Sequence, residues 1–248
     1  EQNEVKHYLI DFVSPDKRYS VAEYKNDAEN VIDKIIKDNK TPIIVGGTGL
    51  YLNSLIYGID YPDIKTDLNY RKELEEKVNK DGLEEIYKEA KIIDPIAVEK
   101  ISKNDKKRIL RILEIYHSTG KTKTELEKDG IKYDYRIFVL NMPRCELYER
   151  INKRVDIMIK EGLIEEVKKI ISKYKEFPTA MQGLGYKEVV EFLENKITKE
   201  EMIEKIKMET RRYAKRQLTW FKSYKEATWL DSNNTNNVDI ILEDISEK

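Results

Sequence analysis

The sequence predicts an α/β fold with a parallel sheet, and three observations in its N-terminal quarter support that prediction. An apolar run at 8–13 ends at a Ser-Pro pair, as a buried strand does where it enters a loop. Apolar residues then recur at helical spacing over 20–38. A β-branched run at 41–45 is followed at once by a glycine turn and a helix-like segment at 50–57. Strand, helix, strand, turn and helix in this order are typical of α/β proteins.

The rest of the chain divides into a helical part and a second α/β part. Helices with charged faces fill 66–119 without a convincing strand. A strand, four helices and a strand are then expected at 137–140, 146–161, 163–174, 187–194, 200–224 and 227–230. The longest helix opens with a capping box that begins at Thr198. We therefore predict an α/β core formed by 1–60 and 135–248, and an all-helical insertion at 61–134.

Composition limits the class of protein and its location. The chain has 46 basic and 47 acidic residues, so its net charge of -1 gives no global argument for nucleic acid, and a polyanion site must come from local clusters. Cys145 is the single cysteine, which excludes an internal disulfide and, with two histidines, argues against structural zinc. The longest apolar stretch, 42–59, is broken by glycines and polar residues. A cytoplasmic protein without a membrane segment is expected.

The glycine turn at 46–49 has two interpretations. Its sequence, Gly-Gly-Thr-Gly, places backbone amides at a helix N-terminus, where they would hold an anion or a polar substrate edge. Thr48 adds a hydroxyl at the carboxyl end of a predicted strand, where open α/β sheets bind ligands. Alternatively, the segment is a tight turn in which glycine only relieves steric crowding. The sequence leaves both interpretations open.

A second glycine segment, 118–122, resembles the end of a P-loop, but the residues before it do not match the P-loop motif. Ile115 stands five residues before Gly120, where the motif requires glycine, and the preceding segment is helical. We predict instead a helix whose C-terminus is closed by Gly120.

Basic side chains gather on three predicted helices. Neighbours on one helix face are found within 106–111, between Arg150 and Arg154, and around Arg211. Guanidinium groups suit phosphates because each presents a planar fork of donors. The alternative for each set is a solvated face or surface pairing, for example with Glu149 or Glu209.

Short motifs are spread along the whole chain. They are His-Tyr-Leu-Ile-Asp at 7–11, Tyr-Ser-Val at 19–21, Val-Gly-Gly-Thr-Gly-Leu-Tyr at 45–51, Asn104-Asp105 with Arg108 and Arg111, Thr-Gly-Lys at 119–121, Arg150 with Arg154, Gly-Tyr-Lys-Glu at 185–188, and Thr-Arg-Arg-Tyr-Ala-Lys-Arg-Gln at 210–217 before Trp220. In order and spacing this set resembles the tRNA dimethylallyltransferase family, also called tRNA isopentenyltransferases.

The resemblance implies a fold, a reaction and partners. The fold is a P-loop kinase-like parallel-sheet core with an all-helical insertion that embraces the anticodon stem-loop. The reaction transfers a dimethylallyl group from dimethylallyl diphosphate to the exocyclic amine of the adenosine next to the anticodon in tRNA. Mg²⁺ is implied as the cofactor that assists departure of the diphosphate.

The resemblance also assigns roles to particular residues. Thr48 is implied as the catalytic residue beside the reacting adenosine. The implied tRNA contacts are Arg71, Lys107, Arg108, Ile109, Leu110 and Arg111. The implied diphosphate ligands are Arg154, Arg150 and Arg211. No metal ligand is assigned.

The sequence departs from the family pattern at two places. Ser102 and Lys103 stand where the family commonly has His-Pro, which alters the helix entry. The family places a P-loop and a base-bearing aspartate-serine segment ahead of the histidine region, whereas here His7 is close to the first residue. We therefore expect an N-terminally truncated chain without its first strand, P-loop, base and magnesium-binding hydroxyl, and expect this fragment to be inactive by itself.

Two other functions remain as alternatives. An isopentenyltransferase acting on free adenine nucleotides would not need the basic helix or the insertion. A non-catalytic RNA-binding module would have no need of a P-loop.

Overall fold

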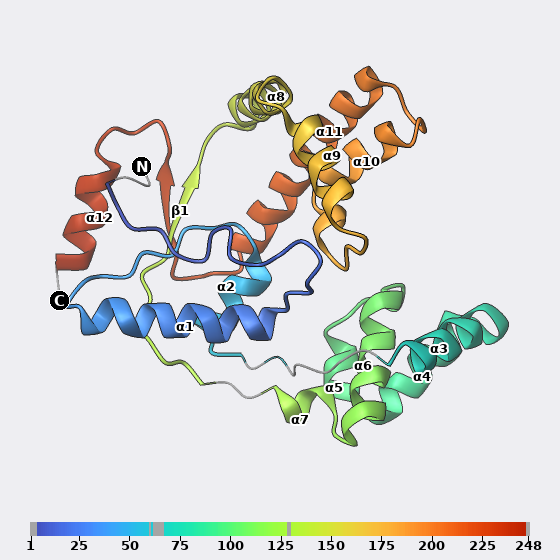
Figure 1. Ribbon diagram of the computed structural model, residues 1–248. Helices are drawn as coiled ribbons and strands as arrows, with labels where there is room; N and C mark the ends of the chain where they lie inside the picture. Colours follow the sequence, from blue (N-terminus) through green and yellow to red (C-terminus); the bar gives the residue numbers. More distant parts are fainter. Residues whose placement is uncertain (1–3, 60, 62–66, 128–129, 247–248) are drawn as a thin grey trace. The chain divides into compact units, whose positions relative to one another are not determined.

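A computed structural model describes residues 4–59, 61, 67–127 and 130–246, and these form two units (Figure 1). One unit consists of 20–33 and 50–133 and is entirely helical where described. The other consists of 1–19, 34–49 and 134–248 and contains a parallel pair of strands with helices. The protein is therefore helix-rich α/β with a small parallel sheet, as the sequence predicts at this level.

Within the helical unit, α3 to α6 (68–119) share one apolar core. The elements of this unit are most of α1 (Val21–Lys37) and α2 (Gly49–Ile56), then α3 (Leu68–Asp81), α4 (Leu83–Ile93), α5 (Pro95–Glu99), α6 (Lys106–Thr119) and α7 (Lys123–Leu126). Helix α4 packs against α3 and α6, and Figure 1 shows the three helices in teal to green. Buried apolar residues from Leu74 to Leu113 fill the space between them. Burial of each Leu, Ile or Val side chain among them contributes about 1.5–3 kcal/mol relative to exposure.

Side-chain and glycine caps fix where these helices begin and end. Asp105 begins α6 by accepting a hydrogen bond from the Arg108 amide at 3.1 Å. Gly120 ends α6 in the left-handed conformation, which confirms the predicted helix terminus and excludes a P-loop there. The Thr122 side chain and Glu125 form a capping box on α7. Local chemistry thus sets the register of the face that carries the basic residues.

Asp94 ties α5 to α7 inside the same unit. The side chain is buried, and its Oδ1 accepts from the Ala97 amide at 3.0 Å and from the Thr124 hydroxyl at 2.7 Å. Its Oδ2 accepts from the Thr124 amide at 2.9 Å. Burial alone would raise the pKa of Asp94, but these hydrogen bonds outweigh it and lower the pKa below its usual value.

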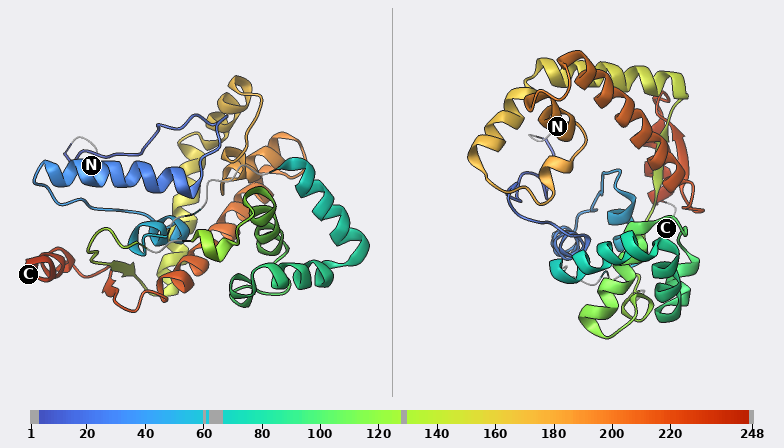
Figure 2. Two further views of the ribbon diagram at one scale, coloured as in Figure 1. Left: turned by 90° about the horizontal axis from the view of Figure 1, so that it is seen from below. Right: turned by 90° about the vertical axis from the view of Figure 1, so that its right-hand side faces the viewer.

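The second unit has two parallel strands and a group of packed helices. Its elements are β1 (Phe138–Asn141), α8 (Arg144–Lys160), α9 (Leu163–Lys173), the 3₁₀ turn η1 (Ala180–Gln182), α10 (Tyr186–Leu193), α11 (Lys199–Phe221), β2 (Thr228–Asp231) and α12 (Asn237–Ser246). Phe138 pairs with Thr228 and Asn141 with Asp231. Helices α8, α9, α10 and α11 enclose a core that includes Val155, Val167, Val189, Met202 and Ile206, and Figure 2 shows these helices together.

Two predicted strands are wrong. Residues 8–13 form bends with Leu9 and Asp11 at φ of 58° and 53°, and residues 41–48 have no regular structure. A strand needs a neighbour to pair its backbone N–H and C=O groups, and across the described ranges β1 and β2 pair only with each other. Accordingly Ile43 and Val45 are 82% and 91% exposed rather than buried in a sheet.

The remaining predicted elements of this unit are confirmed to within a few residues. The capping box at Thr198 opens α11 as expected. Helix α12, by contrast, follows a polar loop and was not predicted. The proposed boundaries of the insertion, 61–134, stay a prediction. The two units are groups of residues in mutual contact, and such a grouping does not show which segment is inserted into the core.

We expect Asp94→Asn to lower the free energy of unfolding by about 1–3 kcal/mol at neutral pH, because an amide NH₂ would face the Thr124 N–H where a carboxylate oxygen now accepts. Since the folded pKa is lowered, the stabilisation is present above the unfolded value of about 3.9 and is lost as pH falls through the folded pKa. Urea denaturation monitored by circular dichroism across pH measures both effects. Glu99→Gln, the same charge change at an exposed position on α5, is the control and should cost under about 0.5 kcal/mol. Equal effects of the two variants would contradict the role of Asp94.

Candidate functional site

The glycine turn at 46–49 lies directly against α11 in its own unit. The Gln217 side-chain amide donates from Nε2 to the Gly47 carbonyl oxygen at 3.0 Å. A Cβ built on Gly47 would lie 1.9 Å from that Nε2, and one built on Gly49 would lie 2.3 Å from the Trp220 ring nitrogen. Glycine at 47 and 49 therefore permits the close approach of α11, which supports the steric interpretation of these two glycines.

Thr48 stands between these two contacts and is free to meet a ligand. Its side chain is exposed, and in the part of the chain that the structure describes its hydroxyl takes no hydrogen bond. Residues 46–48 precede the first turn of α2, which begins at Gly49. The Thr48 side chain is thus exposed between two glycines that pack against α11.

Three predicted diphosphate residues lie on two helices that pack together. Arg150 and Arg154 are exposed on α8, and neither has an ion pair or hydrogen bond among the described residues. Arg211 on α11 is half-buried and donates from Nη1 to Asn152 Oδ1 of α8 at 2.6 Å. The predicted competitor Glu209 pairs instead with Arg212. Two unpaired guanidinium groups, one helical turn apart, therefore present donors to an anion.

The predicted tRNA face centres on a buried carboxylate in the helical unit. Glu114 on α6 has a side chain only 4% exposed and accepts from Arg71 Nη1 at 2.5 Å and from Arg111 Nη1 at 3.3 Å. Arg71 also binds Glu75 at 3.0 Å. The hydrogen bond to Glu114, above other causes, raises the pKa of Arg71. Arg71 and Arg111 are thus held beside each other by one acidic group.

The other predicted tRNA residues differ in exposure. Lys107 and Arg108 are exposed, and Arg108 lies 3.4 Å from Asp105. Ile109 and Leu110 are 0% exposed and belong to the helical core. Their side chains cannot reach a ligand in this structure, so a role for 107–111 in binding has to come from the charged residues that these two side chains anchor.

Aromatic residues lie beside this face and were not singled out from the sequence. His117 on α6 stacks on Tyr70 of α3 with ring centroids 3.7 Å apart and planes 7° from parallel. His117 follows Arg111 and Glu114 at three-residue steps, and Tyr70 directly precedes Arg71. The helical spacing of His117 from Glu114 could therefore have indicated from the sequence that this ring lies on the same helix face as that carboxylate.

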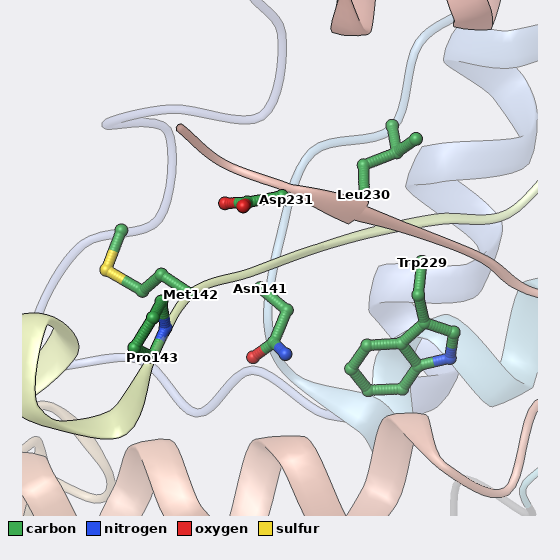
Figure 3. Close-up of a pocket in the computed structure, with 6 residues that line it drawn as sticks. All are labelled: Asn141, Met142, Pro143, Trp229, Leu230 and Asp231. Atoms are coloured by element: carbon green, nitrogen blue, oxygen red, sulfur yellow. The ribbon is translucent and has the colours of Figure 1, made fainter. Parts of the chain in front are cut away.

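A hollow at the carboxyl ends of the two strands was also missed. It has a volume of about 390 Å³ and is lined by Asn141, Met142, Pro143, Trp229, Leu230 and Asp231 (Figure 3). The Asn141 and Trp229 side chains point to the same side of the sheet, and Leu230 to the other. Carboxyl ends of parallel strands commonly bind ligands, and this position was the signal in the sequence.

Neither a metal cluster nor a membrane helix is found among the residues described. No three His, Cys, Asp or Glu side chains gather there in a way that could hold a metal ion. No helix in those ranges is both long and apolar enough to cross a bilayer.

Sequence comparison finds similar proteins over nearly the whole chain. Residues 1–224 match the profile of the family described as IPP transferase. The tRNA dimethylallyltransferase of Halothermothrix orenii is 44% identical over 93% of this chain and 72% of its own length. That of Clostridioides difficile is 45% identical over 99% of this chain and 80% of its own length.

Solved structures give the same result. The full-length tRNA isopentenylpyrophosphate transferase of Bacillus halodurans is 37% identical, with a TM-score of 0.67 over 98% of this chain and 78% of that one. A eukaryotic dimethylallyltransferase, described as acting on tRNA, is 28% identical, with a TM-score of 0.73 over 95% of this chain and 64% of that one.

We expect Glu114→Gln to lower the free energy of unfolding by about 1–3 kcal/mol, because its amide NH₂ would face one of the two guanidinium groups in place of an acceptor. Glu75→Gln also alters a partner of Arg71, but the Glu75 side chain is 47% exposed, so its cost should be about 0–1 kcal/mol. Urea denaturation of both variants makes the comparison. Equal costs would show that burial of Glu114 does not determine its contribution.

Proposed function

The chain belongs to the IPP transferase family, and on that premise we propose that it transfers a dimethylallyl group from dimethylallyl diphosphate to the exocyclic amine of the adenosine next to the anticodon in tRNA. It is a prenyltransferase that acts on tRNA adenosine. The observation that carries this function is the similarity of nearly the whole chain to enzymes named for that reaction.

The reaction makes one bond and breaks another. A C–N bond forms between the amine nitrogen and the carbon that carries the diphosphate, the C–O bond breaks with its electron pair going to the diphosphate, and the amine gives a proton to a base or to water. The base must be unstacked before its amine can be reached. The leaving diphosphate gains negative charge, so cations placed around it stabilise the transition state.

Arg150 and Arg154 are proposed to receive the diphosphate. Both are exposed on one face of α8 and have no acidic partner among the described residues, so binding an anion would break no existing ion pair. Arg211 is proposed as a third ligand from α11, although its present hydrogen bond to Asn152 would have to be shared or exchanged.

Thr48 is proposed to act beside the reacting amine. Its hydroxyl both donates and accepts hydrogen bonds, which lets it orient an amine that carries protons and a lone pair. The exposure of Thr48 and the rigid contacts on either side support this role.

The basic face of α3 and α6 is proposed to contact the anticodon stem-loop. Arg71, Lys107, Arg108 and Arg111 would bind phosphates or stack on bases, as Arg commonly does with RNA. The pairing of Arg71 and Arg111 with Glu114 keeps both guanidinium groups in one orientation, which lowers the entropy lost on binding.

Mg²⁺ and a P-loop kinase-like core are further proposals from the family resemblance. The parallel pairing of β1 and β2 supports such a core. The acidic and imidazole side chains of the described ranges form no group suited to a metal ion, so we assign no residue as its ligand and derive no step through it.

In the full-length protein, Thr48→Ala should lower the rate of prenyl transfer by about 10- to 100-fold while changing tRNA affinity less than about twofold, because the hydroxyl is proposed to act on the reacting amine rather than to hold the tRNA. Single-turnover transfer and equilibrium binding to an anticodon stem-loop measure the two effects. Thr235→Ala, at an exposed threonine in the loop before α12, should leave both unchanged. An unaltered rate in Thr48→Ala would reduce Thr48 to a residue of the turn.

Lys107→Ala combined with Arg108→Ala should weaken binding of the anticodon stem-loop and make the dependence of log affinity on log salt shallower. Each lost phosphate contact reduces that slope by about 0.7–0.9. Both side chains are exposed, and Arg111 is spared because its removal would also disturb Glu114.

The matched control is Lys80→Ala combined with Lys91→Ala, which removes the same charge from exposed ends of α3 and α4. Binding is measured over a salt series, with circular dichroism to verify folding. The proposed tRNA face is refuted if the two double variants give the same slope and affinity.

A further inference from the structure

We propose that Gln217 is a positioning residue that fixes the turn carrying Thr48, an inference that rests on the role proposed for Thr48. Gln217 is not itself expected to touch the tRNA or the dimethylallyl diphosphate. Its side chain holds the backbone from which Thr48 projects.

The argument begins with the atom that Gln217 binds. The Gly47 carbonyl oxygen, which accepts from Gln217 Nε2 at 3.0 Å, belongs to the peptide unit that joins Gly47 to Thr48. A peptide unit is planar from one Cα to the next. A hydrogen bond to that oxygen therefore restrains the plane that contains the Thr48 nitrogen and Cα, the two backbone atoms from which the position of its side chain is set.

A second contact limits the turn on the other side of Thr48. Trp220 lies one helical turn after Gln217 on α11, and its ring occupies the space that a Cβ on Gly49 would need, at 2.3 to 2.4 Å. The turn is thus held before Thr48 by a hydrogen bond and after it by an aromatic ring. The turn has no regular secondary structure of its own at 46–48, so these contacts supply its order.

The same helix also connects the turn to the proposed diphosphate site. Arg211 precedes Gln217 by six residues, or about 9 Å along the axis of α11 at 1.5 Å per residue. Arg211 in turn binds Asn152 on α8, the helix of Arg150 and Arg154. Because α11 is a continuous helix from Lys199 to Phe221, Gln217 sets the position of Thr48 relative to these arginines.

Two variants break the hydrogen bond from opposite sides. Gln217→Leu removes the donor and keeps the approximate side-chain volume. Gly47→Ala leaves Gln217 in the sequence but adds a methyl group 1.9 Å from the present Nε2 position, which displaces the flexible end of that side chain. Gln182→Leu is the matched control, since it makes the same substitution at an exposed glutamine of the same unit.

The first measurement is independent of catalysis. Backbone ¹⁵N relaxation gives the order parameter of the Thr48 amide, which is about 0.85 for rigid backbone and below about 0.6 for flexible backbone. We expect the parent protein and Gln182→Leu at the rigid end, and Gln217→Leu and Gly47→Ala toward the flexible end. An unchanged Thr48 order parameter in both bond-breaking variants overturns the proposal whatever the activity.

The second measurement is prenyl transfer by the full-length protein with an anticodon stem-loop. Gln217→Leu should lower kcat by about 10- to 100-fold with KM for the RNA changed less than about twofold, because a displaced catalytic group impairs the chemical step. The Gln217→Leu and Gly47→Ala effects should be non-additive in the double variant, since each removes the same bond. Normal thermal stability of the variants excludes loss of fold as the cause.

The two proposals fail in different ways. Absence of transfer by the unsubstituted full-length protein would refute the proposed function, while the order parameter would still decide whether Gln217 holds the turn. Transfer that falls in Thr48→Ala but stays normal in Gln217→Leu would overturn the positioning role and leave the function standing.

Discussion

The close approach of α11 to the glycine turn is the contact on which the candidate catalytic arrangement depends. It is possible because residues 47 and 49 have no Cβ, so that the Gln217 amide and the Trp220 ring can occupy the space beside the backbone. The same helix contributes Met202 and Ile206 to the core of its unit. The turn is therefore attached to a helix whose own position is set by buried apolar side chains, and not to another loop.

The two groups of arginines differ in whether an acidic side chain pairs with them. Arg71 and Arg111 share the buried Glu114, which orients them and cancels part of their charge. Arg150 and Arg154 have no such partner among the described residues and keep their full charge for an incoming anion. This difference suits the proposed ligands, because a folded RNA requires oriented contacts over an extended surface, whereas a diphosphate concentrates its charge at one point.

Sequence reasoning located the helices well because their signals are local. The predicted cap Thr198 lies three residues before the Glu201 amide that it binds, and apolar periodicity defines each buried face. Strands at 8–13 and 41–45 were predicted wrongly because a strand depends on partners distant in sequence. The sequence likewise could not show that Ile109 and Leu110 are buried. Nor could it show that Arg71 pairs with Glu114, because these residues are 43 positions apart and meet only in the folded chain. Charge spacing alone could not separate a paired arginine from an unpaired one.

The contacts within the helical core and the contact between Gln217 and Gly47 can form at different times, because the chain is synthesised from its N-terminus. The core of the helical unit lies between Leu74 and Leu113, so little loop-closure entropy opposes its formation, and such local topologies fold rapidly. The turn at Thr48 is bound by Gln217, which follows Gly47 by 170 residues. On the ribosome, α3 to α6 can pack before Gln217, which donates the hydrogen bond to the turn, has been synthesised. The proposed RNA-binding face can therefore form during translation before the proposed catalytic hydroxyl has a fixed position, so that a nascent chain can acquire the shape for its substrate before it is able to react with it.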